Sequence, residues 1–362
     1  MNAAQGVTDD LKMPDRAQAK AYDAGLDVVR MIAITMVIFI HVSGKGFHGM
    51  GEHWWAINAY ESASRVSVPL FFMVTGALLL PRDSTVSSII KRIWRVVVPL
   101  AVWSVAYLAW FKYVPEYNVY YNILGASSST WLEVVLRGPT AGHLWYLYTL
   151  IAAYLFLPVM SSFYRASSSS ILWFVLAIWF VASSVMPFIH GIAGKGFIGI
   201  NWSFFYIYPA YFILGAVIWH KSDINRNRAL VFLLLSVACA CGTAFGTWAA
   251  SDGPGKTNEL YYEYYAPCVF LGAASLFAFV KWLSGMVVIP RVEMLKGAAG
   301  LSFGVYLVHP FFIWFFDLAG FDYSFINPWI SVPVISLAVL LSSCVFVAAL
   351  QRIPLLRSVV PN

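Results

Sequence analysis

The residues with the strongest chemical character lie on one apolar segment near the start of the chain. Asp27, Arg30 and His41 occur within residues 27–43, a stretch that is otherwise mostly apolar. In an α-helix, residues eleven positions apart return to within about 20° of the same face and lie roughly 16 Å apart along the axis. The spacing therefore puts Arg30 and His41 on one face, with a cation at one level and a titratable ring deeper in the helix. A charged or titratable residue inside a span is a candidate for function, although His41 can also be a helix-packing histidine that is hydrogen-bonded to a neighbour.

A second pair of cations follows at the start of another apolar segment. Arg92 and Arg95 are three residues apart, so a helix places both side chains on one face. Two guanidinium groups on one face suit the oxygens of a phosphate, and Arg30 would add a third cation to the same basic pocket. Basic residues also commonly mark the cytoplasmic end of a membrane span. Both interpretations, an anion site and a topology marker, stay open at this stage.

These residues belong to a chain with the composition of a membrane protein. Of its 362 residues, 60% are hydrophobic and only 11% are charged, and the mean hydropathy is +0.73. In a soluble domain about a quarter of the residues are charged, because its surface faces water. We therefore predict an all-α fold, a polytopic membrane protein with about ten transmembrane helices. Ten apolar stretches have roughly the 17–22 residues that a span needs: 27–43, 62–80, 93–113, 143–163, 170–188, 204–219, 229–248, 264–282, 298–318 and 330–350.

The basic residues set the expected orientation of these helices. With ten spans, 17 of the 23 Lys and Arg residues fall at the termini and in the even-numbered loops, against six on the opposite side. By the positive-inside rule both termini are cytoplasmic. We expect a polar cytoplasmic leader over 1–25, a transmembrane domain over 26–351 and a short cytoplasmic tail over 352–362. Because orientation accounts for the net charge of +6, no nucleic-acid partner is predicted.

Other polar residues in or near the spans have local interpretations as well as functional ones. Glu61 and Arg65 are four residues apart and can pair with each other. His143 and Trp145 begin a span at a level where an aromatic belt is expected. His309 directly precedes a proline, so its side chain can satisfy backbone groups near the kink that a proline makes. We keep all five as candidates for an acceptor site or for groups that support the catalytic chemistry.

Few signatures of other chemistry accompany these residues. The sequence contains no Walker-type glycine loop and no His-Glu-x-x-His. The four cysteines lie in apolar segments without metal-ligand spacing, and we expect neither a disulfide nor a metal. The chemistry must therefore use the intramembrane residues.

Five motifs in order along the chain resemble those of the membrane-bound acyltransferase-3 family. The run DVVRMIAITMVIFIH (27–41) is similar to its first-helix signature, an acid and an Arg followed after ten residues by His. The run SASRVSVPLFFMVTGALLL (62–80) resembles its Phe-Phe-x-x-Ser-Gly stretch, with Thr75 in place of the usual Ser. KRIWRVVVP (91–99), GHLWYL (142–147) and SFGVYLVHPF (302–311) resemble three further elements. The resemblance covers about residues 22–350 and is greatest to the short branch typified by the enterobacterial-common-antigen O-acetyltransferase.

The resemblance implies an activity and assigns residues to it. Members of the family transfer an acyl group, usually acetyl from acetyl-CoA, to a hydroxyl of an extracytoplasmic or lipid-linked glycan, and the chain would be a multi-pass protein of the inner (plasma) membrane in contact with membrane lipid. His41 becomes the catalytic histidine and Arg30 its motif partner, while Arg92 and Arg95 become the donor-binding pair. Family position also makes Thr75 a candidate for supporting His41. No metal is implied.

Two other classes of function compete with this one. Ten helices with intramembrane arginines would also serve a transporter or flippase for a glycan or small organic anion. A structural subunit of glycan assembly would not need the aligned pair of Arg30 and His41. Transporters more often break their helices near the midplane, so an uninterrupted helix between these two residues favours the enzyme. Within the enzyme interpretation, we favour direct transfer with His41 as a general base over an acyl-histidine intermediate.

Overall fold

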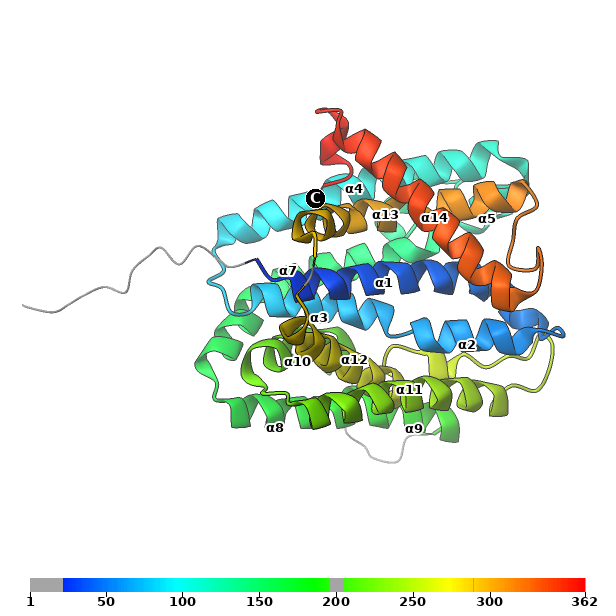
Figure 1. Ribbon diagram of the computed structural model, residues 1–362. Helices are drawn as coiled ribbons and strands as arrows, with labels where there is room; N and C mark the ends of the chain where they lie inside the picture. The colour runs from blue at the N-terminus through cyan, green and yellow to red at the C-terminus, as the bar shows by residue number, and fades with distance from the viewer. Residues whose placement is uncertain (1–21, 196–204, 289, 362) are drawn as a thin grey trace, which may run out of the picture.

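The computed structural model describes residues 22–195, 205–288 and 290–361, so most of the predicted leader lies outside the described residues. Within these ranges every regular element is helical, which confirms the predicted all-α fold. Figure 1 shows the helices packed into one bundle in which most of them run along a common direction. The site therefore has to be built from side chains on neighbouring helices.

Nine helical segments in the described part of the chain are long and apolar enough to cross a membrane, and each corresponds to one predicted span. Several segments are divided into shorter helices, and a π-helical turn at Val181–Val185 joins two of them. Their helices are α1 (Ala24–Ser43), α2 (Trp54–Ser64), α3 (Ser67–Leu79), α4 (Val86–Tyr113), α7 (Trp145–Ala166), α8 (Ser169–Phe180), α9 (Met186–Ala193), α11 (Arg226–Ala249), α12 (Pro267–Met286), α13 (Val292–Leu318) and α14 (Pro328–Gln351).

The tenth predicted span, 204–219, is a shorter element. It corresponds to α10 (Ile207–Lys221), which has 15 residues and extends for about 22 Å, less than the ~30 Å of a bilayer's hydrocarbon core. Almost all of its residues are buried against other helices. A short apolar run does not reveal whether lipid or protein surrounds it. Nine of the ten predicted spans therefore reach the length of a span within the described residues, and the tenth is a shorter, buried helix that still runs alongside α3.

Two glycines bring α10 directly against α3. A Cβ atom added at Gly76 of α3 would collide with the backbone of Phe212 in α10, and one added at Gly215 of α10 would collide with the backbone of Met73. Small residues at a helix contact allow this approach of two backbones in a membrane protein. The contact fixes the position of α3, which carries Thr75.

The first helix, α1, runs through the middle of the bundle, as Figure 1 shows in dark blue. It contacts α2, α3, α12, α13 and α14. The side chain of Asp23 caps its start by accepting hydrogen bonds from the backbone N–H groups of Gly25 and Leu26. The helix is continuous from Arg30 to His41. Both side chains are thus held on one rigid element at two different depths.

The second predicted span is divided. α2 ends at Ser64 and α3 begins at Ser67, and Pro69 in the first turn of α3 lacks the N–H that would continue the helix to the carbonyl of Arg65. A long loop after α4 carries two short helices, α5 (Asn118–Ile123) and α6 (Trp131–Arg137). This loop covers the end of the bundle at which α1 finishes.

Residues 352–361, which we expected as a short tail, fold back against the bundle. The indole N–H of Trp103 in α4 donates to the carbonyl of Val359 (2.9 Å), and the amide of Gln351 donates to that of Val360 (3.0 Å). The Val360 side chain is fully buried. This segment is therefore part of the packed domain, and its Pro361 reaches one of the cavities described below.

Candidate active site

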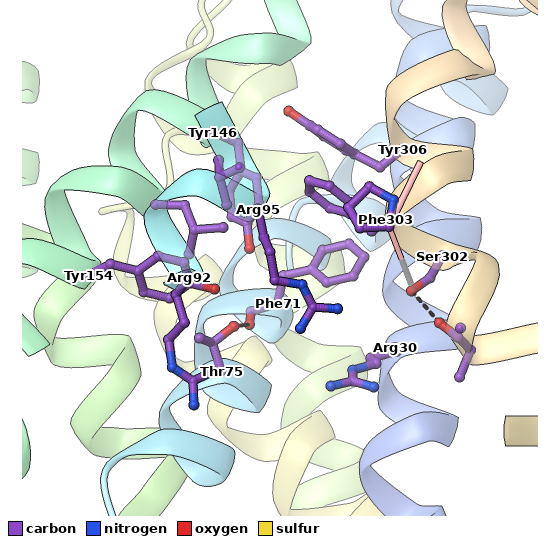
Figure 2. A pocket seen from close by; sticks show the side chains of 15 residues that line it. Arg30, Phe71, Thr75, Arg92, Arg95, Tyr146, Tyr154, Ser302, Phe303 and Tyr306 are labelled. Atoms are coloured by element: carbon purple, nitrogen blue, oxygen red, sulfur yellow. Dashed lines mark hydrogen bonds between the residues drawn. The ribbon is translucent and has the colours of Figure 1, made fainter. Parts of the chain in front are cut away.

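The first of two cavities on α1 collects the three predicted donor-binding arginines. It has a volume of about 280 Å³, and we call it the arginine cavity. Figure 2 shows Arg30 reaching into it from α1, and Arg92 and Arg95 reaching in from α4. Among the described residues that line this cavity none is acidic. Three guanidinium groups around a small space suit the oxygens of a phosphate, as expected from the sequence.

Arg30 is held in place by an ion pair on its own helix. Its Nη1 lies 2.8 Å from Oδ1 of Asp27, whose other oxygen accepts a hydrogen bond from the hydroxyl of Tyr22 at 2.7 Å. Asp27 is buried, while about a third of the Arg30 side chain remains exposed. The acidic residue of the first-helix motif thus orients the arginine and leaves part of its guanidinium available to a ligand.

The rest of the arginine cavity is largely aromatic. Phe71 and Thr75 come from α3, Tyr154 from α7 and Phe303 from α13. The hydroxyl of Thr75 donates to the carbonyl of Phe71 at 2.8 Å, within its own helix. Thr75, which family position suggested as a support for His41, lies in this cavity with the arginines. The aromatic walls suit the uncharged part of an extended ligand.

One motif that sequence reasoning overlooked lies in the same wall. Residues 300–304 read Gly-Leu-Ser-Phe-Gly, a match to the Gly-x-Ser-x-Gly pattern of serine hydrolases. In those enzymes the serine occupies a tight turn between a strand and a helix. Here Ser302 lies inside α13, and its hydroxyl donates to the carbonyl of Ala299 at 2.7 Å. The match therefore lacks the backbone setting that would make the serine a nucleophile.

The second cavity lies toward the other end of α1. It has a volume of about 600 Å³ and is lined by His41 and His143, and we call it the histidine cavity. Glu61, Arg65 and Lys45 also line it, together with aromatic residues of the loop after α4 and of α13. The lining residues of the two cavities do not overlap. Helix α1 is the element that contributes a charged or titratable residue to each.

Three histidines from three separate segments meet at this level. The ring centroids of His41 and His309 are 5.1 Å apart, those of His143 and His309 are 5.3 Å apart, and those of His41 and His143 are 6.2 Å apart. His143 and His309 are buried. The sequence placed all three in the site but could not bring them together, because they are separated by more than 100 residues each.

His309 has a fixed hydrogen-bonding arrangement. Pro310 has no N–H, so the carbonyl of Tyr306 loses its usual helical donor. The Nδ1 of His309 lies 2.8 Å from this carbonyl oxygen and must donate to it. In the neutral ring Nε2 is then the acceptor, and it is buried with no hydrogen-bond partner among the described residues. His309 can therefore satisfy the backbone at the proline kink, as expected from the sequence, and still act beside His41.

Tyr306 separates the two cavities, and sequence reasoning missed it. It lines the arginine cavity, its ring centroid is 5.4 Å from that of His143, and its hydroxyl donates to the carbonyl of His143. Tyr146 packs beside it with centroids 5.5 Å apart. Its position three residues before His309 could have identified it as a site residue, because this spacing places both on one face of a helix.

Ion pairs hold the polar wall of the histidine cavity. Glu61 is fully buried, pairs with Arg65 and accepts a hydrogen bond from Ser43 at 3.2 Å. The guanidinium of Arg65 also lies 4.3 Å from the ring centroid of Tyr262. The pairing expected from the sequence is confirmed, and it leaves the wall polar with little net charge.

Trp145 lies elsewhere. It lines neither cavity and stacks on Tyr264, with centroids 5.5 Å apart and rings inclined by 30°. Its backbone N–H donates to the carbonyl of His143, and its ring also contacts that of Tyr146.

Comparison with known proteins assigns the chain to a family. Curated proteins and solved structures give no match. The family described as the acyltransferase domain, acyltransferase 3, matches residues 23–348. This range takes in α1 to α14 almost entirely, with all three arginines and all three histidines. The chain therefore belongs to the acyltransferase-3 family of membrane-bound acyltransferases.

Proposed function

We propose that this acyltransferase moves an acetyl group from acetyl-CoA to a hydroxyl of a cell-surface or lipid-linked glycan, in the inner (plasma) membrane. The observation that carries the proposal is the pair of cavities along α1, with Arg30 in one and His41 in the other. By the positive-inside rule the arginine cavity faces the cytoplasm, where acyl-CoA is made. The resemblance to the enterobacterial-common-antigen branch favours a glycan acceptor.

The arginine cavity suits the middle of an acyl-CoA molecule. Arg30, Arg92 and Arg95 would hold phosphate oxygens by charge-assisted hydrogen bonds. A volume of about 280 Å³ is near the lower limit for ligand pockets, ~300–1,000 Å³. It would hold the pyrophosphate and the narrow pantetheine arm, with the nucleotide at the mouth. The arm would then extend along the aromatic wall toward Tyr306, and the thioester would pass this side chain to reach His41.

Transfer needs a base, and His41 is suited to be that base. As the acceptor hydroxyl oxygen attacks the thioester carbonyl carbon, a neutral His41 takes the hydroxyl proton. When the tetrahedral intermediate collapses, the C–S bond breaks and the protonated ring returns that proton to the CoA sulfur. His309 would support this cycle, because its Nε2 can accept the N–H of neutral His41 and leave the other His41 nitrogen as the base.

The histidine cavity has features that suit a sugar. Trp314 and Tyr120 line it with aromatic surface on which the apolar face of a sugar ring can lie. Thr140 and Arg65 line the same cavity, and Oγ1 of Thr140 and Nε of Arg65 are buried with no hydrogen-bond partner among the described residues. Buried polar atoms normally have partners, and sugar hydroxyls would supply them.

The test uses the purified protein in lipid nanodiscs with acetyl-CoA labelled in the acetyl group. We expect release of free CoA thiol together with movement of the label to an added glycan or lipid-linked sugar acceptor. A transporter would instead move its substrate across vesicles of the same composition without any thiol release. Absence of thiol release from a protein that binds acetyl-CoA would contradict the proposed function.

A further inference from the structure

A third cavity lies apart from the two that serve acyl transfer. It has a volume of about 500 Å³ and is formed by α8, α10, α11 and α12, and we call it the lateral cavity. It shares no lining residue with the arginine cavity or the histidine cavity. Most of its wall is apolar and includes Phe232, Leu235, Phe270 and Leu271. Neither the proposed reaction nor the family motifs use any of these residues.

The charged residues of the lateral cavity gather at one end. Lys221 is the last residue of α10 and Arg228 is in the first turn of α11. This end lies beside the start of α1, because the indole of Trp219 donates to the side chain of Asp23 at 2.6 Å. The cavity is therefore amphipathic along its length, with cations at the membrane surface and apolar side chains deeper in the bundle. In the predicted orientation this surface is the cytoplasmic one.

The two cations are available to a ligand. The Nη1 of Arg228 donates to the backbone carbonyl of Asp223 at 3.0 Å, and Nζ of Lys221 lies 5.2 Å from the ring centroid of Tyr164. Within the described ranges neither cation forms an ion pair. Lys281, close by, donates to the carbonyl of Ser222 at 2.5 Å. Only one acidic residue, Asp223, is among the described residues that line the cavity, so the end is positively charged.

We propose that the lateral cavity binds an anionic phospholipid of the surrounding bilayer. An acyl chain would lie against Phe232, Leu235 and Leu271, and the phosphate would contact Lys221 and Arg228. Basic pockets between transmembrane helices at the cytoplasmic side bind anionic headgroups in this way. A soluble phosphate compound would satisfy the cations but would leave the apolar part of the cavity unfilled. A cavity with a basic end and a deep apolar interior therefore fits an anionic lipid better than a soluble phosphate compound.

The test measures lipid retention by native mass spectrometry of the full-length protein, released from vesicles of equal phosphatidylglycerol and phosphatidylcholine with matched chains. We expect wild type to retain phosphatidylglycerol in preference to phosphatidylcholine. The double variant Lys221→Ala, Arg228→Ala should lose this preference by about twenty-fivefold, since each basic residue near a headgroup contributes roughly fivefold. The control variant is Arg226→Ala, a neighbouring cation of α11 that does not line the cavity, and it should bind lipid as wild type does.

A second variant tests the apolar part of the cavity. Ala274 lines it, and Ala274→Leu should reduce phosphatidylglycerol retention by filling the space for the chain while the cations remain. A melting temperature close to that of wild type shows that the variant is folded. Equal retention of both lipids by wild type, or unchanged retention in the double variant, would overturn the proposal. Displacement of the lipid by inorganic phosphate alone would also overturn it, because the apolar wall would then contribute nothing. Acyl transfer is not needed for any of these readouts.

Discussion

Replacing His309 by asparagine should separate its backbone contact from its contact with His41. Nδ1 of His309 donates to the carbonyl of Tyr306 at 2.8 Å, and an asparagine amide can donate from nearly the same place. Asparagine has no atom at the position of Nε2, which we expect to accept the N–H of His41. His309→Gln is the converse variant, because its longer side chain reaches the Nε2 position and leaves the Tyr306 carbonyl without its donor.

The two variants should lose different quantities. In His309→Gln a buried carbonyl loses its partner, which should lower the free energy of unfolding by about 1–3 kcal/mol. In His309→Asn that bond is kept, so the stability should change little, but His41 loses the group that we propose orients it. A general base contributes roughly a hundred- to ten-thousandfold, and losing its orientation should remove part of this, on the order of tenfold to a hundredfold in kcat.

The assay measures thiol release at saturating acceptor over a range of acetyl-CoA concentrations, with thermal melting of the same samples. We expect His309→Asn to lower kcat while KM for acetyl-CoA stays near that of wild type, because the arginines that we propose as donor ligands line a separate cavity. A His309→Asn variant with the kcat of wild type would refute the reasoning. The role of His309 would then be limited to the hydrogen bond with the Tyr306 carbonyl at the Pro310 kink.

Three further predictions follow from the same arrangement. His41→Ala should lower kcat by roughly a hundred- to ten-thousandfold and leave acetyl-CoA binding measured by calorimetry nearly intact; a folded variant with normal transfer would remove His41 from the mechanism. Arg92→Ala and Arg95→Ala should each weaken acetyl-CoA binding by roughly ten- to a hundredfold, since one charge-assisted bond contributes about 1.5–3 kcal/mol. Arg95→Lys should also lose affinity, because lysine lacks the planar guanidinium fork. Unchanged affinity in the double alanine variant would leave both residues as topology markers only. Cysteines introduced at exposed positions of the 114–142 loop and of 352–361 should react with impermeant reagents from opposite sides of the membrane, and labelling from one side would contradict the predicted orientation.

Spacing within a helix could be predicted from the sequence, because the helical period fixes it. Arg30 and His41 lie on one continuous helix, α1, and Arg92 and Arg95 enter one cavity from α4. The roles of these residues stay predictions. Contacts between helices could not be predicted from the sequence, because the helical period relates only residues on the same helix. This is why Thr75 was expected beside His41 but lies with the arginines, and why Tyr306 was missed as the side chain between the two cavities.

Hydropathy also left the surroundings of each helix undetermined. The apolar run of α10 predicts a helix correctly, yet its residues contact protein on almost all sides and its 15 residues are short for a span. The same limit applies to residues 352–361. Their few charges and two prolines suggest a tail. One of the hydrogen bonds that fold them back comes from Trp103, a residue of α4 that no pattern within the segment itself could reveal.

The folded-back segment has a consequence for the biosynthesis of the enzyme. Arg30 and Pro361 line the same cavity, yet more than 300 residues separate them in the sequence. At roughly 5–20 residues per second, the ribosome needs on the order of 15 to 60 s to pass from one to the other. During that interval α1 and α4 can already be inserted while Pro361 is missing from the cavity wall. A nascent chain should therefore complete the arginine cavity only after α14 has left the ribosome, which would delay binding of the proposed acyl donor until the bundle is assembled.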